Sequence, residues 1–165
     1  MTATQALRLH VVPIRYSGTR LATPDDDPIP TYAAEAGYDT FDGAATTAEP
    51  ILTDDARTGD PTTDLGVIGG EIADAVAEGL RDGRATLVVG GNCAHVPGVV
   101  GGIQQAYGSE TRIGLLWLDA HGDFNTPRTT FSGMLGGMPV AVSAGLAWPN
   151  WRERSKQIAP LPTDR

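Results

Sequence analysis

An apolar run that ends in acidic and histidine residues constrains this chain more than any other feature of its sequence. Residues 113–118 read Ile-Gly-Leu-Leu-Trp-Leu, between Arg112 and Asp119. A short run with so little polar character is typical of a strand that is covered on both faces, as in a parallel sheet. We therefore predict a buried strand over residues 112–118.

Three potential metal ligands follow this predicted strand, namely Asp119, His121 and Asp123. Residues at i, i+2 and i+4 of a strand lie on one face, and open α/β sheets bind their ligands at the carboxyl ends of strands. Two carboxylates and an imidazole suit a hard or borderline divalent cation. The alternative is that the three residues only form turns and helix caps, where Asp and His are common.

The rest of the chain alternates between strands and helices. We predict strands over residues 7–14 and 85–89 and helices over residues 64–82, 96–107 and 138–147. The helix at 64–82 has Asp64 as its candidate cap and apolar residues at spacings of three and four. This order predicts a three-layer α/β/α domain with a mainly parallel sheet. His10, in the first strand, is expected on the strand surface.

Composition and charge exclude several classes of protein. The chain has 165 residues, 41% of them hydrophobic, and a formal net charge of -8, as expected of a globular domain. An acidic chain without a basic stripe argues against nucleic-acid binding, and no apolar run is long enough to span a membrane. There is one cysteine and no signal-peptide pattern, so we expect a cytoplasmic location.

A second motif, Gly90-Gly91-Asn92-Cys93, follows the predicted strand at 85–89. A glycine pair before a helix can bind phosphate, but the G-x-G-x-x-G spacing and a Walker lysine are lacking, so nucleotide binding is the weaker interpretation. Cys93 has three interpretations. It is a small buried apolar residue, a nucleophile activated by a base such as His95, or a metal ligand.

Both motifs resemble the arginase/agmatinase (ureohydrolase) family. Residues 118–127 and 132–139 match its D-A-H-x-D, N-T-P and S-G-x-x-H-G-x-P signatures, and residues 90–93 stand where the family usually has G-G-D-H-S. The resemblance implies an arginase-like α/β fold and a metal-dependent amidinohydrolase. Such an enzyme cleaves a C–N bond of a guanidino substrate such as arginine, hydroxyarginine or agmatine by a metal-bound hydroxide.

The resemblance also implies a binuclear metal centre held by Cys93, Asp119, His121 and Asp123. Asp119 would bridge the two ions, Cys93 and Asp123 would complete one side, and His121 would serve the other. Manganese is the metal expected from the family. A thiolate from Cys93, in the place of the usual histidine, would shift the preference towards zinc or iron. His95 could supply the imidazole instead if the turn were remodelled.

Three residues of the following loop match positions that hold the carboxylate end of amino-acid substrates in the family: Asn125, Thr130 and Ser132. Their amide and hydroxyl groups suit that role, and hydrogen bonding within the loop is the alternative. The expected partner is therefore a small guanidino substrate. Family members also commonly form trimers or hexamers, so a homo-oligomer is expected of the full-length protein.

Two departures from the family pattern favour a second hypothesis. Gly136 stands where many members have a histidine that relays protons, and the aspartate-rich segment that supplies the remaining ligands is absent from these 165 residues. We therefore expect residues 1–165 to form a single, incomplete ureohydrolase-like domain, a C-terminally truncated fragment. The alternative to an enzyme is a catalytically incomplete metal-binding or interaction module.

Overall fold

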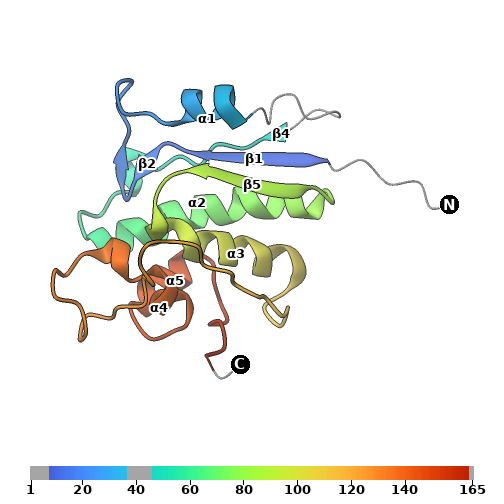
Figure 1. Ribbon diagram of the computed structural model, residues 1–165. Coiled ribbons are helices and arrows are strands. Elements are labelled where there is room, and N and C mark those ends of the chain that lie inside the picture. The colour runs from blue at the N-terminus through green and yellow to red at the C-terminus, as the bar shows by residue number, and fades with distance from the viewer. Residues whose placement is uncertain (1–7, 37–45, 164–165) are drawn as a thin grey trace.

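The structure is a computed structural model that describes residues 8–36 and 46–163, and a short parallel sheet lies at its centre (Figure 1). The sheet contains β4 (Thr46–Thr47), β1 (Leu9–Ile14) and β5 (Ala85–Gly90) in that order, and both pairings are parallel. The central strand β1 is buried along its whole length. The outer strand β5 is mostly half-buried, as expected of a strand with an open edge.

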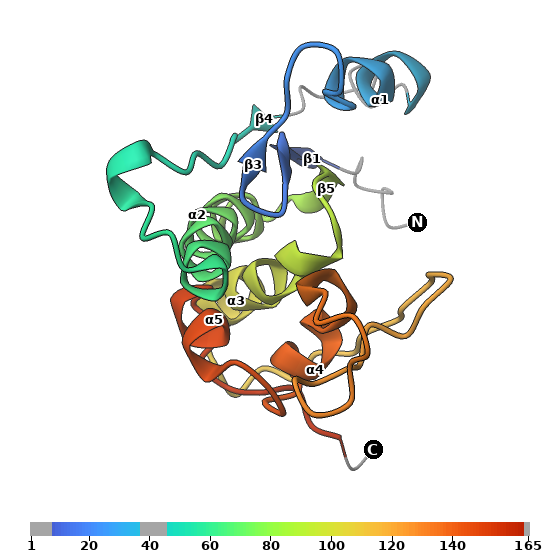
Figure 2. The same cartoon turned by 90° about the vertical axis from the view of Figure 1, so that its left-hand side faces the viewer.

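Helices cover both faces of this sheet, which confirms the predicted α/β/α layering (Figure 2). Helix α1 (Ile29–Ala36) lies on one face and α2 (Pro61–Arg81) on the other. Helix α3 (Val96–Tyr107), in the predicted position, packs against α2. Within the described residues, no helix is both long and apolar enough to cross a lipid bilayer.

Shorter elements complete the chain. They are β2 (Tyr16–Ser17) and β3 (Arg20–Leu21), which form an antiparallel hairpin, the helices α4 (Pro139–Ser143) and α5 (Pro149–Arg154), and the 3₁₀ helices η2 (Asp54–Ala56), η3 (Cys93–His95) and η4 (Leu135–Gly137). The helix predicted over residues 138–147 is thus confirmed only in its first half. It ends early because the chain turns at Gly145, whose φ is 76°, a left-handed value that ends helices.

Helix α2 begins one turn before the predicted start. Its cap is Asp60, whose carboxylate accepts the backbone N–H of Thr63 at 2.8 Å, and Pro61 fills the first helical position, where an N–H is not needed. Asp64, the predicted cap, is buried in the first turn and accepts the backbone N–H of Thr58 at 2.7 Å. The apolar stripe that predicted this helix is buried as expected.

The prediction of a buried strand over residues 112–118 is wrong. Residues 111–118 have no regular secondary structure, and Leu116 and Leu118 are 82% and 86% exposed. A strand requires a hydrogen-bonded neighbour, and among the described residues no strand pairs with this segment. The apolar pattern signals a tendency to be buried, but it cannot supply the neighbouring strand.

His10 also differs from the prediction, because it is buried rather than on the strand surface. Only 1% of it is exposed, and its Nδ1 and Nε2 atoms lie 2.6 Å from Thr46 Oγ1 and 2.9 Å from the Ala75 carbonyl. Helix α2 covers this face of the strand, so an imidazole there has to find partners within the protein. His10 is therefore a satisfied core residue, remote from the predicted ligands.

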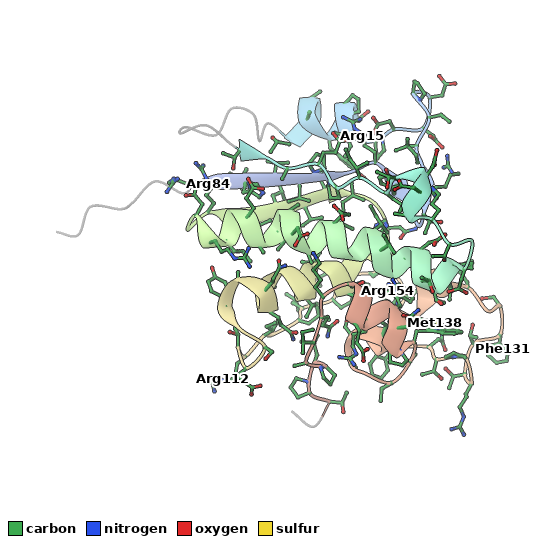
Figure 3. All side chains as sticks on the ribbon, turned by 180° about the vertical axis from the view of Figure 1, so that it is seen from behind. Arg15, Arg84, Arg112, Phe131, Met138 and Arg154 are labelled. Carbon is green, nitrogen blue, oxygen red and sulfur yellow. The ribbon has the colours of Figure 1, made fainter. Side chains whose placement is uncertain are left out.

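A separate apolar cluster packs at the base of the loop that contains the predicted ligands, residues 119–138. Its members come from α2, η3, α4, α5 and their connections, and they are Leu65, Ala94, Met138, Val142, Ala147 and Trp151. Figure 3 shows Met138 near these helices and Phe131 at the outer end of the loop. This cluster anchors the base of the loop to the body of the domain.

Candidate metal centre

Three of the predicted ligands meet just beyond the carboxyl end of β5. Ligand atoms of Cys93, Asp119 and Asp123 all lie within 4.8 Å of one another. The Cys93 thiol donates a hydrogen bond to Asp119 Oδ2 at 3.5 Å. A thiol and two carboxylates at this separation can together bind one divalent ion.

The turn after β5 places Cys93 in this cluster. Gly90 and Gly91 have φ values of 79° and 69°, which most side chains avoid. A Cβ atom on Gly90 would lie 2.6 Å from the Ile14 carbonyl oxygen, so the close approach to β1 also requires glycine. The two glycines therefore turn the chain sharply and bring Cys93 to the end of the sheet.

The two acidic residues reach the cluster from an irregular loop and not from one face of a strand. Asp119 accepts the backbone N–H of His121 at 2.9 Å. Asp123 is buried and has a φ of 44°, and its carbonyl oxygen accepts the N–H of Val140, at the start of α4, at 3.1 Å. A bond within the loop thus holds the Asp119 carboxylate, and α4 fixes the backbone of Asp123, so the two residues converge without the predicted strand.

His121 does not join the three converging ligands. Its side chain is 82% exposed, and its Nδ1 lies 3.5 Å from Asp119 Oδ1. It does line the same cavity. The assignment of His121 as a ligand stays a prediction.

Electrostatics in the cluster favour a cation. Burial, followed by the neighbouring carboxylates of Asp123 and Asp119, raises the pKa of the Cys93 thiol to about 12. The backbone N–H of His121 is the main cause that lowers the pKa of Asp119. At neutral pH the metal-free site therefore holds a protonated thiol beside anionic carboxylate, and a cation that binds there would displace the thiol proton.

A cavity of about 800 Å³ opens beside the cluster. Its volume falls in the range of small-molecule sites. All seven predicted site residues line it, together with Asn92, Gly136 and other residues of the loop; the seven are Cys93, Asp119, His121, Asp123, Asn125, Thr130 and Ser132. The sequence motifs thus surround one common space, although they come from two segments of the chain.

The predicted substrate-binding residues also make hydrogen bonds inside the loop. Asn125 Oδ1 accepts from Thr129 Oγ1 at 3.1 Å, Thr130 Oγ1 accepts from the Gly133 N–H at 3.0 Å, and Ser132 Oγ accepts a backbone N–H at 3.2 Å. These bonds match the alternative of loop hydrogen bonding. They leave the Asn125 amide group and the two hydroxyl hydrogens able to donate to a ligand.

His95 is a residue of this region whose role the sequence did not predict. It is 3% exposed, its Nδ1 accepts the backbone N–H of Asn92 at 3.1 Å, and its Nε2 donates to the Gly18 carbonyl at 2.8 Å. Burial lowers its pKa. Both nitrogens are thus engaged elsewhere, so His95 is neither the substitute ligand nor the base for Cys93. The Asn-x-x-His spacing of a capping box could have indicated this role.

The sequence of this chain is similar to sequences of known proteins. The model of the Arginase family matches residues 30–158. An arginase from Bacillus caldovelox is 40% identical over 79 residues, which cover 48% of this chain and 25% of that protein. Human Arginase-1 is 39% identical over 77 residues, 47% of this chain and 23% of its own length. The aligned part thus covers about a quarter of each of these two relatives.

Solved structures show the same fold over a longer span. The arginase from Bacillus cereus superposes with a TM-score of 0.73 at 22% identity, over 95% of this chain and 54% of that one. The arginase from Bacillus caldovelox gives a TM-score of 0.72 at 23% identity, over 93% of this chain and 54% of that one. The chain therefore spans about half of the fold in these structures.

Proposed function

Because this chain belongs to the arginase family, we propose that it contributes a metal-binding site to a hydrolase that cleaves a C–N bond of a guanidino substrate. The observation that carries the proposal is the convergence of Cys93, Asp119 and Asp123 beside a cavity lined by the family's loop motif. The donor set fits a divalent cation because it offers two anionic oxygens and an ionisable sulfur.

The chemistry that such ions supply is a water molecule that ionises near neutral pH and acts as the nucleophile. In our proposal Cys93, Asp119 and Asp123 would hold one ion, and Asp119 and His121 would contribute to holding a second. The His121 side chain is exposed and lines the same cavity. Manganese is the first metal to test, and zinc and iron follow because a thiolate is a soft ligand.

The loop supports the proposed substrate class. Asn125, Thr130 and Ser132 have donor hydrogens beside the cavity, and donors suit the carboxylate end of an amino acid such as arginine or hydroxyarginine. Agmatine has no carboxylate. We therefore expect alanine at these positions to weaken binding of arginine more than binding of agmatine.

An incomplete metal-binding or interaction module is the second candidate function. It is favoured by Gly136 in the position of the family's relay histidine and by the small number of ligands that converge among the described residues. On this alternative the chain binds a cation, but it releases no product even when the rest of the fold is supplied.

Complementation separates these two functions. The chain is mixed with the half of the Bacillus caldovelox arginase fold that it does not span, in Mn²⁺, and urea release from arginine and from agmatine is measured. Urea that appears only in the mixture, and is lost with Asp119→Ala, supports the hydrolase. Stoichiometric metal binding without urea from any of these substrates supports the module.

Other expectations for this protein stay predictions. They are a homo-oligomeric full-length protein, no nucleic-acid or membrane partner, and a cytoplasmic location. Light scattering on the purified protein tests the oligomeric state.

A further inference from the structure

The turn that contains Cys93 also contains a buried imidazole. His95 is buried, yet both of its ring nitrogens contact backbone groups. An apolar side chain would fill the same space without the cost of burying a polar ring. The two hydrogen bonds therefore indicate that His95 holds particular backbone groups in place.

The first of these bonds acts on the turn that carries Cys93. Asn92 and His95 cap the turn reciprocally, because Asn92 Oδ1 accepts the Ala94 N–H at 3.1 Å while His95 Nδ1 accepts the Asn92 N–H at 3.1 Å. The 3₁₀ helix itself has three residues, too few to be rigid on its own. The two reciprocal bonds thus link the residues on either side of Cys93 and restrain the turn between them.

The second bond fixes the tautomer of the imidazole and links the turn to a distant hairpin. Because the Gly18 carbonyl can only accept, Nε2 carries the hydrogen and Nδ1 is left as the acceptor that the Asn92 N–H requires. Gly18 lies at the turn between β2 and β3, and Arg57 donates to the carbonyl of the neighbouring Thr19 at 2.8 Å. The imidazole is therefore hydrogen-bonded to the β2–β3 hairpin, which Arg57 in turn contacts.

The preceding glycine shows how closely the imidazole is packed. A Cβ atom on Gly91 would lie 2.6 Å from His95 Nδ1. The ring thus occupies the space that any other residue at position 91 would need, next to the flexible glycine pair. A rigid contact at this point offsets the freedom that the two glycines give to the chain before Cys93.

From these contacts we infer that His95 is a positioning residue that holds the Cys93 sulfur towards Asp119 and Asp123, through the Asn92 N–H and the Gly18 carbonyl. The inference rests on the proposed metal-binding function. Residues that orient metal ligands through hydrogen bonds typically change metal affinity by about 10- to 100-fold when they are replaced. The same magnitude is expected for the loss of His95.

The first experiment uses Co²⁺ as the probe, because a bond between cobalt and a thiolate gives a charge-transfer absorption in the near ultraviolet. We compare the unaltered chain with His95→Phe, which keeps the ring volume and removes both bonds, and with His95→Gln, which restores an acceptor at the capping-box position. His10→Phe is the matched control, since His10 is also buried and bonded through both ring nitrogens, but far from Cys93.

The expected result is a cobalt affinity at least about tenfold lower in His95→Phe, a substantial recovery in His95→Gln, and no change in His10→Phe beyond its effect on thermal stability. An unchanged affinity in folded His95→Phe overturns the inference. If His95→Phe does not fold, Asn92→Ala replaces it, because Asn92 is exposed and its substitution removes the other half of the reciprocal cap. A tenfold loss is again expected, and unchanged affinity overturns the inference.

A second readout needs no metal, so the inference and the proposed function can fail separately. In the metal-free chain Cys93 should react slowly with iodoacetamide, because its thiol is partly buried and donates a hydrogen bond to Asp119 at 3.5 Å. Releasing the turn should speed alkylation at least about tenfold in His95→Phe and not in His10→Phe. Equal rates in all three chains overturn the inference. A chain without a cobalt–thiolate band, but with faster alkylation in His95→Phe, contradicts only the metal-binding proposal.

Discussion

Met138 offers a direct test of how the candidate site is supported. It is 1% exposed in the cluster with Trp151, and its sulfur accepts the Trp148 indole N–H at 3.3 Å. Met138→Ala removes three side-chain heavy atoms from a closed core, and substitutions of this kind cost about 2–5 kcal/mol. We take about 3 kcal/mol as the expected loss of unfolding free energy. For a chain of this length that loss corresponds to about 6–12 °C in melting temperature.

The control for this change is Met134→Ala, in the same loop. Met134 is 67% exposed, so its truncation should change the unfolding free energy by less than about 0.5 kcal/mol. Both variants are compared with the unaltered chain by urea denaturation followed by circular dichroism. Equal losses in the two variants, or a loss below about 1 kcal/mol for Met138→Ala, would refute the account of a core-anchored loop.

The remaining predictions concern folding contacts that the structure reveals. Burial raises the pKa of Asp64, but hydrogen bonds from Thr58 outweigh it and the net shift is downward, so Asp64→Asn should cost about 1–3 kcal/mol at pH 7. This stabilisation is complete above the unfolded pKa of about 4 and is lost as the pH falls through the lower folded value; urea titrations that give the same difference at pH 7 and pH 3 would contradict it. Leu116→Lys should leave the unfolding free energy within about 0.5 kcal/mol of its original value, because the side chain is exposed, whereas a loss of several kcal/mol would favour the buried strand. Gly91→Ala should lower the melting temperature more than Gly83→Ala, since both glycines have positive φ but only the Cβ at position 91 would meet neighbouring atoms; equal shifts would argue against the close packing of the imidazole there.

Much of the fold could be predicted because local patterns determine it. The strands at Leu9–Ile14 and Ala85–Gly90 and the helix Val96–Tyr107 lie where the sequence places them, although residue 7 of the first predicted strand is outside the described residues. The spacing of apolar residues and the positions of glycines predict the bounds of such elements to within a few residues. The start of α2 at Pro61 was missed because two aspartates compete as caps, and the earlier one, Asp60, has a proline after it.

The segment at 112–118 shows what a sequence pattern cannot determine. Its apolar side chains indicate burial, but burial depends on partners that the segment itself does not encode. Leu116 is exposed because no described strand pairs with its segment.

The convergence of three predicted ligands could be predicted from the sequence, but the geometry by which they meet could not. Cys93, Asp119 and Asp123 meet as the motifs suggest, yet the acidic pair arrives through a loop with a left-handed residue at Asp123. The His121 side chain is exposed, and its backbone N–H, not a neighbouring strand, bonds to the Asp119 carboxylate. The role of His95 depends on Gly18, which is remote in the sequence, so only the folded chain reveals it.

The most direct test of the account is the metal content of the purified chain. After equilibration with Mn²⁺ or Zn²⁺ and removal of free ions, elemental analysis should find at least one ion per chain. Asp119→Ala and Asp123→Ala should each reduce it to background, while Asp54→Ala, at a fully exposed carboxylate, should retain it. Equal metal in all four chains, or none in the unaltered one, would contradict the claim that Cys93, Asp119 and Asp123 form a metal centre.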